Sequence, residues 1–315
     1  MTATTIEQRS DLPVISFVIP CYRSENTVSS VIADIKRVVA QREEYSYEII
    51  CVVDGSPDNV FEVLKSLASR DEHLKVISFA KNAGKHSALL AGFSIVSGNY
   101  IVAVDDDGEC PISELWSLIT PLENGYDIAM ARYGHRPVSM IKELEHSVNA
   151  FMVRKLIGKP KDIEFSNFSA RKRFVCDYLV KYSGPYPYLE GETLAITRNI
   201  AMVDLPACKR ISGSSGFTFR RGLSLFLNGC TTYSILPLRL PYYLFLICLV
   251  FSIGSLFAWF ISSSFILLSL MLFIFTLLFL SIGLLGEYVG RLYMVANHLP
   301  QYVIRETVNC DEEVL

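Results

Sequence analysis

Several features that would assign this chain to a familiar class are missing from its sequence. Its eight cysteines are scattered, with no C-x-x-C pair and no cysteine–histidine cluster, so neither a disulfide framework nor a structural zinc is expected. The net charge of -3 lacks the strongly basic balance of a nucleic-acid-binding protein. Residues 1–11 are polar and lack the apolar core of a cleavable signal peptide, so we expect the globular part to stay in the cytoplasm.

Short motifs of several enzyme classes are also missing. There is no G-x-G-x-x-G after a predicted strand, no G-x-x-x-x-G-K-[ST], no H-E-x-x-H and no G-x-S-x-G. His86, His135 and His146 lack the spacing of metal ligands and are expected at the surface. These absences weigh against a dinucleotide-dependent oxidoreductase, a nucleoside triphosphatase, a zinc hydrolase and a serine hydrolase.

Charged residues are missing from one long stretch near the C-terminus, between Leu240 and Gly286. Within it, Tyr242–Ile261 and Phe265–Leu285 are each long enough to cross a hydrocarbon core of ~30 Å as a helix. Arginines before the first and after the second span place both flanks on the cytoplasmic side. The alternative, a buried helical hairpin in a soluble core, is disfavoured by so long an uncharged stretch.

The first half of the chain alternates strand-like and helix-like patterns. Short apolar runs predict four strands, and amphipathic spacing predicts the helices between them. The expected strands are Val14–Ile19, Glu48–Val53, Leu74–Ala80 and Tyr100–Val104, and the expected helices are Val28–Val39, Val60–Leu67 and His86–Val96. Apolar strands between amphipathic helices indicate a parallel sheet covered on both faces, whose ligands bind beyond the carboxyl ends of the strands.

Beyond Pro111 the pattern is less regular. Tyr126–Ala131 is a candidate strand, and Lys142–Leu156 is a candidate helix. The stretch Gly213–Leu238 mixes basic and apolar residues. It predicts either an interfacial helix whose basic side chains meet anionic lipid headgroups or an ordinary surface helix.

Three adjacent carboxylates, Asp105, Asp106 and Asp107, end the fourth predicted strand. Such neighbours repel one another unless a cation or solvent compensates their charge. Two carboxylates separated by one residue suit a Mg2+ or Mn2+ ion that also binds a diphosphate. A solvated acidic turn is the alternative, and a D-x-D alone is a weak signal.

Two further turns are expected at the same edge of the sheet. Asp54 follows the second strand, and its carboxylate could accept hydrogen bonds from a nucleobase or ribose, or could only form an Asx turn. Lys85 follows the third strand within Asn82–Lys85 and could neutralise a phosphate, or could be a surface lysine in a turn. The residues alone leave both interpretations of each turn open.

Together these segments resemble the inverting family 2 glycosyltransferases of the GT-A fold, in particular the polyisoprenyl-phosphate branch that includes dolichol-phosphate mannose synthase and bacterial undecaprenyl-phosphate sugar transferases. The resemblance covers nearly the whole chain, and the order of the motifs is more specific than any one of them. The matching segments are Val18–Tyr22 with Glu25, Val53–Ser56, Asn82–Lys85, Val104–Asp107 with Pro111, Ala131–Tyr133, Arg210–Phe217, Phe226–Arg239 and Gly286–Arg291.

The resemblance implies an α/β fold, with a GT-A Rossmann-like domain of mostly parallel sheet followed by interfacial helices and a two-helix transmembrane hairpin. The expected boundaries are a cytoplasmic catalytic domain at 1–212, juxtamembrane interfacial helices at 213–240, two transmembrane helices at 241–286 and a cytoplasmic tail at 287–315. The protein is then a multi-pass protein of the cytoplasmic membrane with both termini in the cytoplasm. A homo-oligomer, such as a tetramer, is compatible with the resemblance.

The resemblance also implies roles for individual residues. Asp105 and Asp107 would bind the Mg2+ or Mn2+ ion and would form the catalytic group with Arg132 and Arg210. Both arginines would contact phosphates of the donor or the lipid acceptor, because a planar guanidinium can bind two phosphate oxygens at once. The residues implied for nucleotide-sugar binding are Pro20, Tyr22, Glu25, Asp54, Lys85 and Asp106, and those implied for the acceptor phosphate are Arg210, Ser215 and Asn167.

The implied reaction is metal-dependent transfer of a sugar, with inversion, from a nucleotide-diphosphate sugar to a polyprenyl phosphate. The lipid would be undecaprenyl or dolichyl phosphate at the cytoplasmic membrane face, and the product would feed cell-surface glycan assembly, such as polysaccharide biosynthesis. The sequence does not specify the sugar, the nucleotide or the lipid length. No nucleic acid is expected as a partner.

One departure from the family concerns the catalytic base. Related bacterial enzymes carry an Asp-Phe-Arg element where this chain has Asn167-Phe168-Ser169, and an asparagine cannot take the proton. A phosphate monoester is largely dianionic at neutral pH, with a second pKa near ~6, so it needs positioning more than deprotonation. We therefore expect the metal and the arginines to align the lipid phosphate, with Glu190 and Glu192 as reserve candidates for a base.

Two alternatives remain beside this reaction. A non-catalytic scaffold that binds nucleotide sugar or lipid is motivated by Asn167 and opposed by the intact acidic pair. A processive polysaccharide synthase is opposed by the absence of a Gln-x-x-Arg-Trp element, since Trp116 and Trp259 are the only tryptophans. One membrane hairpin is also too small to form a translocation pore alone.

Overall fold

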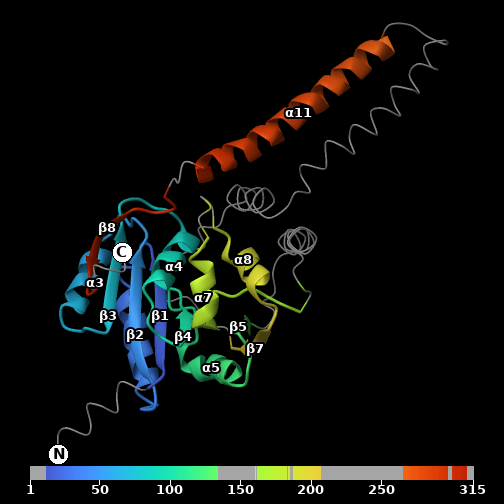
Figure 1. Ribbon diagram of the computed structural model, residues 1–315. Coiled ribbons are helices and arrows are strands. Elements are labelled where there is room, and N and C mark those ends of the chain that lie inside the picture. The colour runs from blue at the N-terminus through green and yellow to red at the C-terminus, as the bar shows by residue number, and fades with distance from the viewer. Residues whose placement is uncertain are drawn as a thin grey trace, which may run out of the picture. The chain divides into compact units, whose positions relative to one another are not determined.

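The structure is a computed structural model that describes residues 12–133, 160, 162–182, 184, 187–206, 265–296 and 300–310. The chain divides into two compact units (Figure 1). The sheet unit comprises Met1–Glu143, Lys159–Gly216 and Pro300–Leu315, and the second unit comprises Leu144–Gly158 and Phe217–Leu299. The candidate site residues that the structure describes all belong to the sheet unit.

A mixed sheet is the framework of this unit, and its described strands follow the order β7-β5-β6-β4-β1-β2-β3-β8. The strands are β1 (Val14–Cys21), β2 (Ser46–Val53), β3 (Leu74–Phe79), β4 (Tyr100–Ala103), β5 (Ile128–Tyr133), β6 (Ser169–Lys172), β7 (Ile200–Leu205) and β8 (Ile304–Val308). β1 runs parallel to β2 and β4, β2 to β3, and β5 to β7, whereas β6 and β8 are antiparallel to their neighbours. The predicted strands and the mostly parallel sheet are confirmed.

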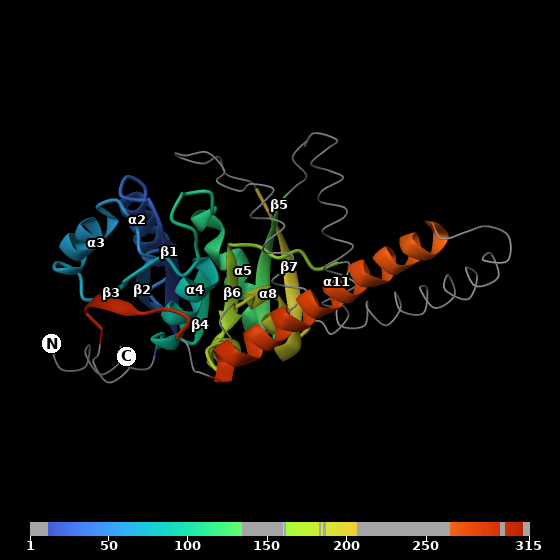
Figure 2. The same ribbon diagram turned by 90° about the horizontal axis from the view of Figure 1, so that it is seen from above.

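Helices cover both faces of the sheet (Figures 1 and 2). One face carries α2 (Val28–Val39), α3 (Val60–Ala68), η1 (Ile112–Glu114) and α5 (Leu115–Glu123), and the other carries α4 (Lys85–Ser94), α7 (Arg173–Leu179) and α8 (Leu189–Ile196). The valines and isoleucines of α2 recur at the spacing of one helix face and are all buried, from Val28 to Val39. The three helices predicted in the first half are therefore confirmed.

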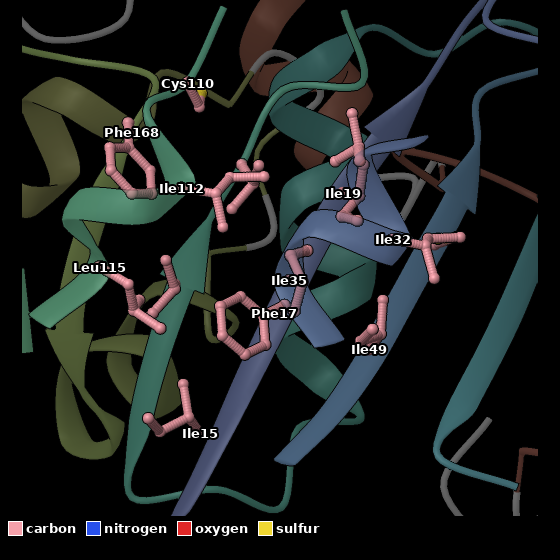
Figure 3. Packing of buried hydrophobic residues seen from close by; sticks show 14 of the residues in the cluster. Ile15, Phe17, Ile19, Ile32, Ile35, Ile49, Cys110, Ile112, Leu115 and Phe168 are labelled. Atoms are coloured by element: carbon pink, nitrogen blue, oxygen red, sulfur yellow. The ribbon is translucent and has the colours of Figure 1, made fainter. Parts of the chain in front are cut away.

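The two hydrophobic cores follow from the alternation of side chains along β1. Ile15, Phe17 and Ile19 pack into the core on the α2 side, seen in Figure 3, whereas Val18 packs into the core on the α4 side. Burial of a side chain such as Phe17 contributes about 2–3 kcal/mol relative to exposure. A Cβ atom on Gly92 of α4 would lie 2.2 Å from Val18 Cγ1, so glycine allows α4 to approach β1 closely.

The sequence did not predict β6, α7, α8, β7 or β8. β6 enters the sheet between β4 and β5 although it has only four residues, two of them basic, and lacks a long apolar run. β8 belongs to the segment expected as a C-terminal tail, yet it returns to the sheet edge and pairs with β3 (Figure 1). Both strands form through tertiary pairing, which periodicity within a short segment does not reveal.

In the second unit the structure describes one helix, α11 (Phe265–Ala296). Its window Phe273–Gly290 is long and apolar enough to cross a membrane, and it is the single such helix among the described residues. α11 begins where the second predicted span begins and continues past its predicted end at Leu285. The two-helix hairpin is not confirmed, because the first span lies outside the described residues, as do the stretches 142–156 and 213–238.

Candidate active site

The carboxyl ends of three parallel strands bring three polar loops together. Val18 of β1 lies opposite Ala103 of β4, and Cys21 at the end of β1 lies opposite Val53 of β2. The residues that follow these strand ends, including Asp54 and Asp105, therefore share one edge of the sheet. This is the edge at which ligands of parallel α/β sheets bind.

Asp106 connects the loop after β4 to the loop after β1. Its Oδ2 atom accepts a hydrogen bond from the Tyr22 backbone N–H at 2.9 Å. Burial raises the pKa of Asp106, and the charges of Asp105 and Asp107 raise it further, while the neighbouring Ser24 hydroxyl and the hydrogen bond from the Tyr22 N–H offset part of the rise. The middle carboxylate of the acidic run thus holds the Tyr22 loop in place.

Asp105 and Asp107 have different neighbours. The Lys85 ammonium forms an ion pair with Asp105, and Asp107 Oδ1 accepts the backbone N–H of Glu109 at 3.0 Å. Among the described residues, no group of three or more acidic, histidine or cysteine side chains forms a metal site by itself. The pair nevertheless fits Mg2+ or Mn2+, because such ions commonly take one or two carboxylates together with substrate phosphates.

Asp54 is buried and ties the turn after β2 to the loop before α4. Its Oδ1 accepts the Ala83 N–H at 2.6 Å, its Oδ2 accepts the Gly84 N–H at 2.9 Å, and its carbonyl accepts Asn82 Nδ2 at 3.0 Å. Burial raises the pKa of Asp54, and the two backbone hydrogen bonds offset part of this effect. The carboxylate thus joins two loops that are about thirty positions apart, which is not the local Asx turn that the sequence left open, and each of its oxygens keeps a lone pair for a ligand.

Gly55 makes the close packing of these two loops possible. Its φ is +55°, a left-handed conformation that glycine adopts readily. A Cβ atom there would lie 2.4 Å from both Asn82 N and Lys81 C. We therefore expect no other residue to fit at position 55 without displacing the Lys85 loop.

The loop after β1 is bonded to the loop after β2 by a set of reciprocal hydrogen bonds. Glu25 N–H donates to Asp58 Oδ2 and Glu25 Oε2 accepts the Asn59 N–H, both at 3.0 Å. Ser56 Oγ accepts the Arg23 N–H at 2.8 Å and donates to Asp58 Oδ1 at 2.5 Å. Glu25 thus supports the loop, and the sequence did not single out Arg23, Ser56 or Asp58 because the bonds join residues more than thirty positions apart.

Two other residues implied for the donor occupy different environments in the same segment. Pro20 is buried within β1 opposite Val52, where it shapes the end of the strand. Tyr22 follows the strand and is 44% exposed, so its ring is accessible to a ligand. The structure therefore brings Tyr22, Asp54, Lys85 and the acidic run to one edge.

Asn167 lies at the same edge, on the side of β5 and β6. Ser169 of β6 pairs with Ala103 at the carboxyl end of β4, and Phe168 O accepts the Ala131 N–H at 3.1 Å. Asn167 precedes these residues and is exposed. Its backbone position is thus set by pairing on both sides, while its side chain stays accessible.

Arg132, at the end of β5, is engaged by a neighbouring carboxylate. Its Nε and Nη2 atoms donate to the two oxygens of Asp204 at 2.6 and 2.9 Å, which raises the pKa of Arg132. Arg132 also lines a groove of about 460 Å³ with Thr120 of α5 and Met202 of β7. The other two residues implied for the acceptor phosphate, Arg210 and Ser215, lie outside the described residues.

His86, expected at the surface, is half-buried and contacts the start of α8. Its Nδ1 accepts the Leu189 N–H at 3.4 Å, its ring centre lies 5.9 Å from that of Tyr188, and burial together with the Lys85 charge lowers its pKa to about 4. His86 therefore attaches the start of α8 to the start of α4.

Of the reserve bases on α8, Glu192 is buried and accepts the Tyr188 N–H at 3.1 Å, whereas Glu190 accepts the Tyr188 hydroxyl.

A mostly parallel sheet with helices on both faces and an acidic run at its carboxyl edge is the architecture of a GT-A-like α/β fold. The profile of Glycosyl transferase family 2 matches residues 16–178. The chain belongs to this family, as the sequence motifs indicated.

Relatives that span almost the whole chain extend this assignment. The protein is 27% identical over 308 residues to the undecaprenyl-phosphate 4-deoxy-4-formamido-L-arabinose transferase of Photorhabdus laumondii, covering 93% of this chain and 94% of the relative. It is also 27% identical to the glycosyltransferase YkcC of Bacillus subtilis, covering 95% of this chain and 96% of the relative. Both matches extend well beyond the family 2 segment.

A solved structure supports the fold. Glucosyl-3-phosphoglycerate synthase from Mycobacterium tuberculosis, in complex with Mn2+, UDP-glucose and phosphoglyceric acid, superposes with a TM-score of 0.52 at 22% identity. The likeness covers 73% of this chain and 84% of that chain. At this identity the comparison establishes the fold alone.

Proposed function

We propose that this protein transfers a sugar, with inversion, from a nucleotide-diphosphate sugar to a polyprenyl phosphate at the cytoplasmic face of a membrane. The product is a lipid-linked sugar for cell-surface glycan assembly. The observation that carries the proposal is the shared edge of β1, β2 and β4, where Lys85 and the acidic run lie beside the Tyr22 loop and Asp54. The relative named for transfer to undecaprenyl phosphate supports the choice of acceptor.

Asp105 and Asp107 are the residues that would hold Mg2+ or Mn2+. A bound divalent ion neutralises charge on the departing nucleoside diphosphate. Lys85, which now pairs with Asp105, can move its ammonium onto a phosphate oxygen when the diphosphate binds. The Mn2+ and UDP-glucose in the structurally similar synthase support this arrangement.

The donor nucleoside is proposed to lie on the loops after β1 and β2. Tyr22 and Asp54 would contact it directly, since one is exposed and the other keeps free lone pairs. Pro20 and Glu25 would act by shaping and bracing the loop, and Asp106 would hold Tyr22 in position. The sugar would then project toward the side of the edge where β4 and β5 end.

The acceptor phosphate is proposed to bind on that side, near Asn167 and Arg132, with Arg210 and Ser215 completing its surroundings. A phosphate oxygen attacks the anomeric carbon on the face opposite the leaving diphosphate, so the configuration inverts. A dianionic phosphate needs no base, and the Asn167 amide can donate a hydrogen bond that orients it. A pH profile of turnover that requires a deprotonated group other than the phosphate itself would contradict this base-free scheme.

A membrane anchor has a physical purpose in this reaction. A polyprenyl tail leaves the bilayer at a cost of ~0.8 kcal/mol per CH2, so the catalytic unit must come to the lipid. We propose that residues 1–212 form the catalytic domain together with β8, that residues 213–240 lie at the membrane surface and that residues 241–286 form the two-helix hairpin of a multi-pass protein. α11 and the uncharged stretch before it support this topology, and a homo-oligomer remains compatible with it.

The test is nucleoside diphosphate release by the full chain in detergent. A panel of UDP-, GDP- and dTDP-sugars is supplied with Mn2+ or Mg2+, with and without undecaprenyl phosphate. We expect release that requires both lipid and metal and disappears in Asp107→Ala, while Asp34→Ala, an exposed acid of α2, serves as the matched control. Donor binding without lipid-dependent release across the panel would instead favour the scaffold.

A further inference from the structure

Arg23 has a backbone conformation that is unusual for its residue type. Its φ is +57°, in the left-handed region that residues other than glycine rarely adopt. The only other non-glycine residue with a positive φ in the described chain is Asn309, and asparagine tolerates this conformation better than arginine. Strain of this kind persists where the surroundings hold it and is concentrated at ligand-binding sites.

Hydrogen bonds on both sides hold this conformation. The Tyr22 N–H is bonded to Asp106 after β4, and the Arg23 N–H is bonded to Ser56 after β2 at 2.8 Å. Ser56 is bonded in turn to Asp58. The backbone at position 23 is thus clamped between two loops of the candidate site before any ligand binds.

The guanidinium of Arg23 is exposed at this edge. Its central carbon lies 5.5 Å from the centre of the Tyr22 ring. Across the described ranges of the chain, no carboxylate pairs with it, because the nearby acids have other partners: Asp58 bonds Ser56 and Glu25, and Asp105 pairs with Lys85. An arginine fork beside an exposed aromatic ring suits a planar ligand with oxygen acceptors on its rim.

We infer that Arg23, together with Tyr22, recognises the nucleobase of the donor. The Tyr22 ring stacks on the base, and the guanidinium donates hydrogen bonds to a base carbonyl oxygen. The bond to Ser56 places Arg23 over the ends of β1 and β2, whereas the acids that suit the metal and diphosphate follow β4. The inference rests on the proposed function, which supplies a nucleotide as the ligand, and deepens it by naming a specificity residue.

The test is calorimetric titration of the full chain in detergent with Mn2+ and UDP, GDP, dTDP or inorganic pyrophosphate. Arg23→Asn removes the guanidinium and keeps a residue that tolerates a positive φ, so its melting temperature should not fall. We expect the Kd of the preferred nucleoside diphosphate to rise about tenfold, as for loss of a specific base contact, with pyrophosphate binding unchanged. Arg23→Lys should give an intermediate loss, and Arg37→Ala, which removes an exposed cation of α2, should change nothing.

Two outcomes would overturn the inference while leaving the proposed function intact. One is nucleotide binding by Arg23→Asn that equals the wild type. The other is an equal loss for pyrophosphate and nucleotide, which would move the guanidinium onto the phosphates. A wild-type protein that binds none of the three nucleotides would overturn the proposed function as well.

Discussion

Buried carboxylates have pKa shifts of opposite direction at the two ends of the parallel strands. At the amino end, Glu48 of β2 is bonded to Lys75 at 2.8 Å and to Ser16 Oγ and the Ser97 N–H, both at 2.6 Å. Burial alone would raise the pKa of Glu48, but the bonds from Lys75, Ser16 and Ser97 together outweigh it and lower the pKa. This carboxylate is fully satisfied by the protein.

At the carboxyl end, Asp54 and Asp106 have raised pKa values because burial outweighs their hydrogen bonds, and for Asp106 two adjacent carboxylates add to the rise. The protein therefore offsets the charge of these acids only in part, which favours cations at this edge. Asp54 and Asp106 themselves hold loops together through their hydrogen bonds, so the acids that would take a metal are Asp105 and Asp107. The comparison thus contrasts an acid whose charge is stabilised within the fold, Glu48, with an edge at which a bound cation would be stabilised.

The largest expected effect is on turnover at the carboxyl end. Asp105→Asn removes the negative charge of one proposed metal ligand and of the partner of Lys85. We therefore expect lipid-dependent nucleoside diphosphate release to fall by at least ~100-fold. The melting temperature should change little, since the Asp105–Lys85 pair is partly exposed. A loss of activity below tenfold, or a large drop in melting temperature, would contradict the division between the two ends.

The next effect is on stability at the amino end. Lys75→Met leaves Glu48 buried without its cation, and we expect a loss of about 2 kcal/mol in the free energy of unfolding. Thermal melting in detergent measures this loss, and turnover per folded molecule should be unchanged. The double variant Lys75→Met/Glu48→Gln should lose less than the sum of the single variants, and additive losses would mean that the two side chains are not coupled.

The pH dependence of stability should have opposite signs at the two ends. Glu48 has a lowered folded-state pKa, so its contribution is present above its unfolded pKa of ~4.3 and is lost as pH falls through the lower folded value. Asp54 has a raised pKa, so wild type gains stability relative to Asp54→Asn as pH falls from its folded pKa toward ~3.9. Melting curves from pH 7 to pH 3 should show each trend, and the same sign for both would contradict the comparison.

The smallest effect concerns the exposed pair at the end of β5. Asp204→Asn should not change the melting temperature measurably, because an exposed ion pair contributes little to stability. The substitution frees Arg132 to bind the lipid phosphate. We therefore expect the KM for this phosphate to fall by a factor of about two to five, which corresponds to the free energy of a weak surface ion pair. A higher KM would show that Asp204 positions Arg132 productively, and an unchanged KM would remove Arg132 from the acceptor site.

Much of the first half of the fold could be predicted from local sequence. Apolar runs and helix spacing located β1 to β4 and α2 to α4, because burial on both faces of a parallel sheet leaves continuous apolar strands. The same reasoning brought Tyr22, Asp54 and Asp105 to one edge, since the carboxyl ends of parallel strands meet there. The motif order then indicated the family that the profile match establishes.

Only the tertiary structure decided how the acids are used. Asp106 and Glu25 carry out supporting roles through hydrogen bonds to residues 84 and 34 positions away, and no local pattern reports such a bond. Short strands such as β6 and β8 form because a neighbouring edge accepts their backbone, which depends on distant partners. The sequence by itself thus determined which groups reach the edge, and long-range backbone hydrogen bonding decided which of them remain available to a substrate.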